Sequence, residues 1–186
     1  MCRVADVCLD AGVLTAVETR RWERLVHRAD RDAYLAAHVL VRHVAAEFIS
    51  AAGDVDRLAV VQSCPGCGGI DHGRPAIAGH PGVHVSLSHT RGVVAAIAAA
   101  GPCGIDVEAH RTGGVPAGTL TPREQSWADG QPEPGAAFTR LWARKEAWVK
   151  ATGEALDRAV MLDVLDADWV TGELRTEEYA AAWVVL

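Results

Sequence analysis

The chain has 186 residues, of which 49% are hydrophobic, and its formal net charge is −6. This length suits one large domain or two small lobes, and the negative charge argues against nucleic acid as the main partner. No apolar run is long enough to cross a bilayer, and the N-terminal MCRVADVCLD lacks a signal-peptide pattern, so we expect a soluble, cytoplasmic protein with no membrane partner.

The first predicted elements are helices. The stretch from about Thr15 to Ala52 carries apolar residues close to the 3.6-residue period of a helix. These positions are Leu35, Val39, Leu40, Val44, Phe48 and Ile49. Gly53 is expected to end the helical region.

The cysteines come next. There are five, an odd number, so free thiols are expected rather than a disulfide framework. In CPGCGGIDHG, Cys64 and Cys67 form a CxxC pair with His72 close behind. A zinc site requires four ligands, and the fourth would have to come from His80, His84 or Cys103. A glycine-rich turn with two free thiols is the favoured interpretation, and a zinc site remains open as the alternative.

The middle of the chain is predicted to be a β-meander. The segments RLAVVQS, GRPAIAG, VHVSLSH and VVAAIAAA lead through a turn into GIDVE, residues 104–108. Side chains alternate between the two faces of a strand, so Asp106 and Glu108 should share one face while Ile105 and Val107 share the other.

The last part of the chain is predicted to contain two helices and more strands. Thr121 can cap a helix that begins with Pro122 and has Glu124 in a capping box. A second helix, AAFTRLWARKEAWVKATG, should end at Gly153. Beyond it, VMLDVL and YAAAWVVL are predicted strands, with a short one between them.

Three side chains of the second helix form a stripe. Trp142, Glu146 and Lys150 are spaced by four residues, which places them along one side of the helix. Glu146 and Lys150 alone would be an ordinary surface ion pair. Together with Asp106 and Glu108, however, Glu146 would bring three carboxylates to one place, which suits Mg²⁺ or Mn²⁺.

Residues suited to a phosphate group occur in the first half of the chain. Ser88, His89 and Thr90 follow an apolar strand, and Arg74 precedes Pro75. Arginines also follow one another along the first helical region, at positions Arg20, Arg21, Arg24, Arg28 and Arg31. Guanidinium groups bind phosphate through paired hydrogen bonds.

The motifs GRP, SLSHT, GIDVE and WARKEAWVKATG, in this order, resemble those of the 4′-phosphopantetheinyl transferases of the surfactin-synthetase-activating type. The resemblance extends from about Glu18 to the C-terminus. It implies an α+β fold of two similar α/β lobes with pseudo-twofold symmetry and the active site between them. Residues 1–108 would form the N-terminal lobe and residues 109–186 the C-terminal lobe.

The resemblance also implies an activity. The enzyme would transfer the phosphopantetheine arm of coenzyme A to a serine of an acyl or peptidyl carrier protein of fatty acid, polyketide or nonribosomal peptide synthesis, and release adenosine 3′,5′-bisphosphate. We expect a monomer.

Residue roles follow from the same resemblance. Asp106, Glu108 and Glu146 would hold Mg²⁺ or Mn²⁺, Lys150 would contact the pyrophosphate, and Glu146 or a water that it orients would be the base. Arg74 and Pro75 would border the adenine, His89 and nearby basic residues would hold the 3′-phosphate, and Ser88 and Thr90 would lie beside the phosphates. The carrier would dock on the connector after Glu108 and on the helix from Thr121, with Leu120 and Trp127 as apolar contacts.

Many relatives have an arginine for the 3′-phosphate where this chain has Ala33, so Arg21, Arg28 or Arg31 is expected to take its place. Two alternatives of other classes remain: a noncatalytic coenzyme A-binding relative or regulatory module, and a small zinc-binding interaction domain organised by Cys64 and Cys67.

Overall fold

The computed structural model describes residues 1–50, 52–64, 66–70 and 72–186. The chain divides into two compact units, Met1–Pro102 and Cys103–Leu186. Strand β6 (Cys103–Ala109) pairs with β8 (Tyr179–Val185) and therefore belongs to the second unit. The boundary expected after Glu108 is thus wrong for this strand, because its partner lies at the far end of the sequence.

The first unit contains a five-stranded antiparallel sheet in the order β1-β5-β4-β3-β2. Its strands are β1 (Cys2–Arg3), β2 (Val60–Ser63), β3 (Arg74–Ile77), β4 (His84–Thr90) and β5 (Val93–Ala99). The predicted meander is confirmed from β2 to β5. It does not continue into GIDVE, which pairs in the other sheet.

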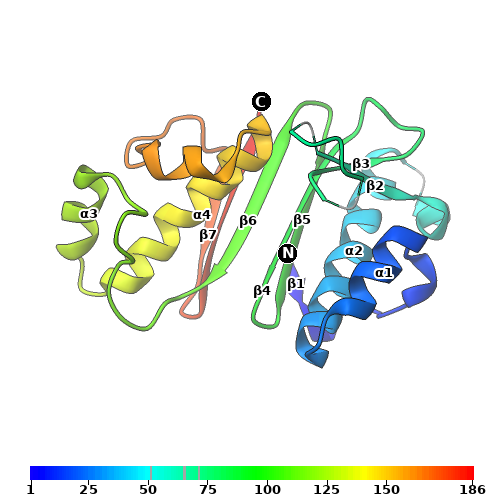
Figure 1. Ribbon diagram of the computed structural model, residues 1–186, viewed down its shortest axis with the longest axis horizontal. Coiled ribbons are helices and arrows are strands. Elements are labelled where there is room, and N and C mark those ends of the chain that lie inside the picture. Colours follow the sequence, from blue (N-terminus) through cyan, green and yellow to red (C-terminus); the bar gives the residue numbers. More distant parts are fainter. Residues whose placement is uncertain (51, 65, 71) are drawn as a thin grey trace. The chain divides into compact units, whose positions relative to one another are not determined.

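Helix α2 (Arg28–Phe48) packs on the central strands of this sheet, as Figure 1 shows. Its apolar side meets the sheet in a core that contains Val41, Ala45, Ile77 and Val85. The predicted period is therefore that of a buried helical face. The helix ends at Phe48 and Ser50 adopts a positive φ of 57°, so the chain leaves the helix before Gly53, where the end was expected.

The remaining elements of the first unit are short. Helix α1 (Ala16–Arg24) begins with a capping box between Thr15 and Glu18. Single 3₁₀ turns form η1 (Val4–Asp6) and η2 (Ala11–Val13), and η3 spans Ala52–Arg57.

The second unit contains a three-stranded antiparallel sheet in the order β6-β8-β7, with β7 at Gly172–Arg175. Helix α4 (Pro134–Thr152) lies against β6 and β8, and α3 (Pro122–Asp129) packs on α4. Small residues on both sides allow this contact, since Ala143, Ala147 and Ala151 of the helix meet Ala182 and Val184 of the sheet. Both helix signals are confirmed: Thr121 forms the capping box of α3, and Gly153, with a φ of 75°, ends α4.

The strand predicted at VMLDVL is wrong. Its first two residues, Val160 and Met161, end the 3₁₀ helix η4 (Leu156–Met161), and the residues after them form no strand. Buried side chains bind its backbone groups: Lys145 Nζ donates to the carbonyls of Ala159 and Leu162, and Glu124 accepts from the N–H of Val164. These contacts replace the strand partners that the apolar pattern led us to expect.

The fold is mixed α+β, as predicted, with helices on an antiparallel sheet in each unit. The pseudo-twofold relationship between the units stays a prediction. Within the described residues, no helix combines the length and the apolar character that a bilayer crossing demands.

Candidate active site

The two carboxylates of GIDVE lie on β6, the strand on which α4 packs. Asp106 is only 1% exposed, while Glu108, nearer the end of the strand, is partly exposed. Asp106 pairs with Ala182, whose side chain belongs to the cluster facing α4. Directly paired residues point to the same face of a sheet, so Asp106 faces the helix. Glu108, two residues further on, faces the same way, as the sequence predicted.

Gly104 sets the distance between β6 and α4. A Cβ at this position would lie 2.0 Å from the carbonyl oxygen of Ala147 and 2.5 Å from the nitrogen of Ala151. Both atoms belong to the helix backbone, which cannot rotate away as a side chain can. The glycine therefore allows α4 to approach β6 closely, and this brings Glu146 and Lys150 next to the strand carboxylates.

Lys150 joins the strand to the helix. Its Nζ lies 2.6 Å from Asp106 Oδ1 and 3.7 Å from Glu146 Oε2. The stripe of Glu146 and Lys150 is thus more than a surface ion pair, because Asp106 is buried and the side chains of Glu146 and Lys150 are only 20% and 29% exposed. Asp106, Glu108, Glu146 and Lys150 form what we call the carboxylate–lysine cluster.

Burial and mutual repulsion shift the pKa values of the acids in this cluster. Burial, together with the charges of Asp106 and Glu146, raises the pKa of Glu108 to about 7. Burial and Asp106 also raise the pKa of Glu146, although Lys150 and Trp142 act in the opposite direction. Burial opposes the charged form of Lys150, but Asp106 and Glu146 outweigh it and raise the pKa of the ammonium group. The cluster therefore favours any further positive charge placed beside its carboxylates.

The donors of the cluster fit a hard divalent cation. All three acids offer oxygen, the ligand that Mg²⁺ and Mn²⁺ prefer. With the acids ionised, three carboxylates face one ammonium, which leaves a formal excess of two negative charges that a divalent cation would balance. Their oxygens do not form a ligand group within 4.8 Å of one another. Lys150 lies against Asp106. Binding would require Glu108 or Glu146 to turn toward Asp106.

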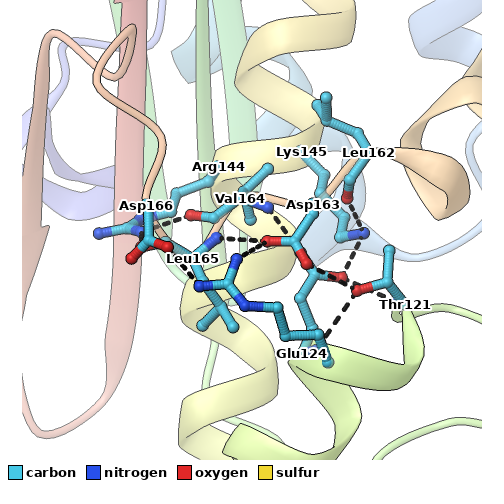
Figure 2. A network of polar contacts seen from close by, with 10 residues as sticks. Thr121, Glu124, Arg144, Lys145, Leu162, Asp163, Val164, Leu165 and Asp166 are labelled. Atoms are coloured by element: carbon cyan, nitrogen blue, oxygen red, sulfur yellow. Dashed lines mark hydrogen bonds and ion pairs between the residues drawn. The ribbon is translucent and has the colours of Figure 1, made fainter.

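A network on another side of α4 was not foreseen from the sequence (Figure 2). Lys145 and Glu124 are both fully buried, with Nζ and Oε2 2.7 Å apart. Arg144 donates to the carbonyl of Val164 and pairs with Glu173 of β7. Glu124 was predicted only as part of a capping box, and nothing local in the sequence indicates its partner 21 positions away. The network fixes α4 and thereby the orientation of Glu146 and Lys150.

A pocket of about 250 Å³ lies beside this network. It is lined by Arg123, Trp127, Arg140, Leu141, Arg144, Leu165 and Asp166. Its arginines are already paired, Arg123 with Asp163 and Asp166, and Arg140 and Arg144 with Glu173. The pocket is therefore not a strong anion site. Trp127, a predicted docking residue, lines it; Leu120, the other, is only 9% exposed and belongs to the core of this unit, which corrects that prediction.

The residues predicted to bind the nucleotide belong to the first unit. Arg21 Nη1 donates to Gln62 Oε1 at 3.2 Å, and Gln62 is paired with Pro75 across β2 and β3. The structure thus brings Arg21 to the strand pair that carries Arg74 and Pro75.

The other two arginines differ from Arg21. Arg31 Nε donates to the carbonyl of Leu25 at 2.6 Å and so holds the turn between α1 and α2. The side chain of Arg28 is 93% exposed and lies 3.5 Å from Asp32. Ala33 itself is buried. Of the three arginines predicted to replace an arginine at Ala33, Arg21 is the one that contacts the β2–β3 pair.

Ser88, His89 and Thr90 occupy the last three positions of β4, so the strand extends one residue beyond the predicted VHVSLSH. Ser88 is buried, His89 is exposed and Thr90 is intermediate. They pair with Ala95, Val94 and Val93 of β5.

A second unforeseen network holds the first unit together. Glu18 Oε1 lies 2.5 Å from His38 Nδ1, and Glu18 Oε2 lies 2.7 Å from Arg42 Nη2. Arg42 is fully buried and also donates to the carbonyl of Leu58. Despite the opposing effect of burial, these contacts and the N–H of Thr15 lower the pKa of Glu18 to about 2. The network ties α1 to α2.

Comparison with known proteins adds one result. No curated protein matches the chain. Residues 102–184, fewer than half of the chain, match the family model of the 4′-phosphopantetheinyl transferase superfamily. This stretch coincides with the second unit and contains the whole carboxylate–lysine cluster. The match supports a transferase function in general, the transfer of phosphopantetheine, for the unit that carries Asp106, Glu108, Glu146 and Lys150.

Proposed function

We propose that the protein transfers the 4′-phosphopantetheine arm of coenzyme A to a serine hydroxyl of an apo acyl or peptidyl carrier protein, in a reaction that depends on Mg²⁺ or Mn²⁺. The observation that carries the proposal is the carboxylate–lysine cluster inside the stretch that resembles the superfamily. The finer assignment, to enzymes of the surfactin-synthetase-activating type, rests on the motif order GRP, SLSHT, GIDVE and WARKEAWVKATG.

The reaction forms one bond and breaks one. The serine Oγ bonds to the phosphorus that carries the pantetheine arm, the bridging P–O bond of the pyrophosphate breaks, and adenosine 3′,5′-bisphosphate leaves. The serine proton goes to Glu146, directly or through a water. Burial and the charge of Asp106 raise the pKa of Glu146, so its carboxylate accepts a proton more readily than a fully solvated one would.

Lys150 stabilises the charge that develops on the pyrophosphate. Its ammonium lies among the carboxylates, where the charges of Asp106 and Glu146 keep it protonated. A fixed positive charge of this kind needs little rearrangement when negative charge builds up on the leaving oxygen. Asp106 holds the ammonium through its contact at 2.6 Å.

Asp106, Glu108 and Glu146 are the proposed metal ligands. A bound divalent cation would neutralise the pyrophosphate oxygens and orient them. Arrival of the cation would also favour the ionised form of Glu108, whose pKa the neighbouring acids raise to about 7.

Residues of the first unit are proposed to hold the nucleotide end of coenzyme A. Arg74 and Pro75 would border the adenine, with Arg21 beside them through Gln62. Ser88, His89 and Thr90 would contact the phosphates, with Arg28 and Arg31 contributing positive charge. Among the arginines, Arg21 is the best-supported phosphate ligand, because Arg31 is engaged with the carbonyl of Leu25.

The carrier protein is proposed to dock on the connector after Glu108 and on α3. Carrier proteins are usually acidic around the modified serine, so basic residues should line this surface. Arg111 is exposed there, and Trp127 offers apolar contact area; Arg123 is also exposed but is already paired with Asp163 and Asp166. Leu120 lies in the core, so Trp127 is the apolar docking residue of the two that the sequence predicted.

Mass spectrometry of the carrier protein tests the proposal. Apo carrier proteins from fatty acid, polyketide and nonribosomal peptide synthesis are incubated with coenzyme A and Mg²⁺, and each is examined for the added mass of one arm. Asp106→Asn should abolish the product. Glu177→Gln, which changes an exposed carboxylate of the β7–β8 turn, should leave it unchanged. No mass shift on any carrier, despite adequate folding, would refute the transfer.

The same experiment separates the second candidate, a noncatalytic coenzyme A-binding module. Calorimetry with coenzyme A accompanies the mass measurement. Binding without transfer would favour the module, whereas transfer excludes it.

A further inference from the structure

Three side chains in the loop between β2 and β3 bring their ligand atoms together. The sulfur atoms of Cys64 and Cys67 and a ring nitrogen of His72 lie within 4.8 Å of one another. Cys67 Sγ is 3.2 Å from His72 Nε2. Over the residues that the structure describes, no other group of three His, Cys, Asp or Glu side chains is this compact. The loop belongs to the first unit and is not part of the carboxylate–lysine cluster.

The backbone of the loop is folded around the cysteines. The N–H of Cys64 donates to the carbonyl of Gly69 at 2.9 Å, and the N–H of Gly68 donates to the carbonyl of Cys64 at 2.8 Å. The N–H of Gly69 points at Cys67 Sγ, 3.4 Å away, and those of Gly66 and Cys67 point at Cys64. Backbone N–H groups directed at sulfur stabilise the thiolate, the form in which cysteine binds a metal.

Two glycines make the approach of His72 possible. A Cβ at Gly69 would lie 2.5 Å from Cε1 of His72 and 3.2 Å from Sγ of Cys67. Gly73 has a φ of +100°, and a Cβ there would lie 2.3 Å from the carbonyl oxygen of Ser63. These positions require glycine so that the imidazole can reach the thiols and the chain can return into β3.

We propose that Cys64, Cys67 and His72 bind one Zn²⁺ through two thiolates and one imidazole, with the fourth position open to a solvent molecule or a small ligand. Thiolate and imidazole are the donors that zinc prefers, and tetrahedral ligation with its usual bond lengths separates ligand atoms by about 3.6 Å. The observed contact of Cys67 and His72 is close to this value. The compact group includes His72, which closely follows the CxxC pair in the sequence, and it does not include His80, His84 or Cys103, the residues expected to supply a fourth ligand.

Two other uses of a CxxC pair fit less well. A thioredoxin-like redox pair requires a helix that begins at the motif, but β2 leads through this loop into β3. Both cysteines are free thiols, so the loop is formed without a disulfide. The zinc site explains why a histidine and two glycines accompany the pair.

The metal would tie the ends of the loop together just before the GRP motif. Ser63 is paired with Arg74 and Gln62 with Pro75, so Cys64 directly continues β2 and His72 is two residues short of β3. Zinc ligation closes this loop and favours the register that places Arg74 and Pro75. A role of the zinc in placing Arg74 and Pro75 for the nucleotide rests on the proposed function. Zinc binding itself does not depend on that function.

Metal analysis of the purified protein tests the site. The reduced protein, prepared without chelator and loaded with Zn²⁺, should hold one zinc per chain after desalting. Cys64→Ser, Cys67→Ser and His72→Ala should each lose it, while Cys8→Ser, which changes an exposed thiol outside the loop, should keep it. Wild-type protein without zinc, or variants that hold as much as wild type, would overturn the proposal.

Thiol protection in the intact chain decides the matter even if a variant fails to fold. N-ethylmaleimide is applied to zinc-loaded and to chelator-stripped protein, both under reductant that does not compete for the reagent, and modified peptides are mapped by mass. Cys64 and Cys67 should be protected by zinc at least tenfold, and Cys8 should react at the same rate in both samples. Equal labelling of Cys64 and Cys67 in the two samples would rule out the site, whether or not carrier modification is observed.

Discussion

Lys150 Nζ lies 2.6 Å from Asp106 Oδ1 and 3.7 Å from Glu146 Oε2, so one ammonium group links strand β6 to helix α4 at the centre of the carboxylate–lysine cluster. The nearest partner, Asp106, is buried, whereas Glu146 is reached only at a longer distance. The contact with Asp106 therefore holds the Lys150 ammonium in place. A group that stabilises developing charge acts best from such a fixed position.

Lys150→Ala should lower kcat much more than the affinity for coenzyme A. Loss of one preorganised charge at a developing anion typically lowers the rate by about 10² to 10³-fold. Steady-state kinetics and calorimetric binding of coenzyme A measure the two effects separately. Arg158→Ala, at an exposed position of η4, is the control and should change neither. Equal losses in rate and affinity would assign Lys150 to ground-state binding instead.

Asp106→Asn and Glu146→Gln should remove metal binding as well as transfer. Each substitution keeps the shape of the side chain and deletes one anionic oxygen ligand. Electron paramagnetic resonance of added Mn²⁺ reports bound metal without any need for turnover. Wild type should bind Mn²⁺ in the presence of coenzyme A, and both variants should bind at least tenfold more weakly, whereas Glu177→Gln should match wild type. Unchanged Mn²⁺ binding in both variants would show that the cluster is not the metal site.

Gly104→Ala should destabilise the second unit strongly. The added Cβ would lie 2.0 Å from the backbone oxygen of Ala147, so α4 would have to move away from β6. Overpacking of this kind costs about 1–3 kcal/mol, and more where backbone is the obstacle. Urea denaturation measures the loss. Gly114→Ala is the matched control, since nothing lies within 4 Å of a Cβ there; equal stability of the two variants would refute the role of Gly104 as a spacer.

Removal of one member of the Glu124–Lys145 pair should lower the free energy of unfolding strongly. Both side chains are 0% exposed, so Lys145→Met would leave the carboxylate of Glu124 buried without its ammonium partner. Breaking a buried pair in this way costs about 3–5 kcal/mol. Asp32→Asn, which breaks the exposed contact with Arg28, should cost less than about 1 kcal/mol. Chemical denaturation of the two variants would contradict this account if their losses were similar.

Local signals in the sequence predicted those parts of the fold that depend on neighbouring residues. The capping box of Thr121 and Glu124 and the stop at Gly153 are satisfied within a few residues, and both are confirmed. The apolar pattern of VMLDVL was misleading, because its backbone groups are bound by Lys145 and Glu124, which are distant in sequence. No periodicity contains that information.

In the candidate site, too, local patterns were predictable from the sequence, whereas contacts between distant segments were not. Alternation along GIDVE placed Asp106 and Glu108 on one face, and helical spacing placed Glu146 with Lys150. The direct contact of Lys150 with Asp106 depends on how closely α4 approaches β6, and this is set by Gly104, which was not predicted to matter. Similarly, the spacing of Cys64 and Cys67 is plain in the sequence, but the approach of His72 to the thiols depends on the close backbone packing at Gly69 and Gly73.

Acid should weaken the first unit through Glu18. The pKa of this carboxyl is about 2 in the folded chain, well below its usual value of 4.5, because His38, Arg42 and the N–H of Thr15 favour the charged form against the effect of burial. A group whose pKa is lower in the folded state stabilises the fold above its unfolded pKa, and this contribution is lost as the pH falls toward the folded pKa. The stabilisation by Glu18 is therefore lost between about pH 4.5 and about pH 2. A difference of two to three pKa units corresponds to about 3 kcal/mol of folding free energy.

Hydrogen exchange measured by mass spectrometry on peptides of α2 follows this unit separately from the second one. Protection should decline steeply across that window in wild type. Glu18→Gln should be less protected at neutral pH, because Arg42 then stays buried without a carboxylate, and its remaining protection should depend less on pH between 4.5 and 2. Glu23→Gln, which changes an exposed carboxylate on α1, the helix that carries Glu18, should behave as wild type. If Glu18→Gln kept the full acid sensitivity of wild type, the titrating group would have to be a different one, and the Glu18–His38–Arg42 network would not be the acid-sensitive element of this unit.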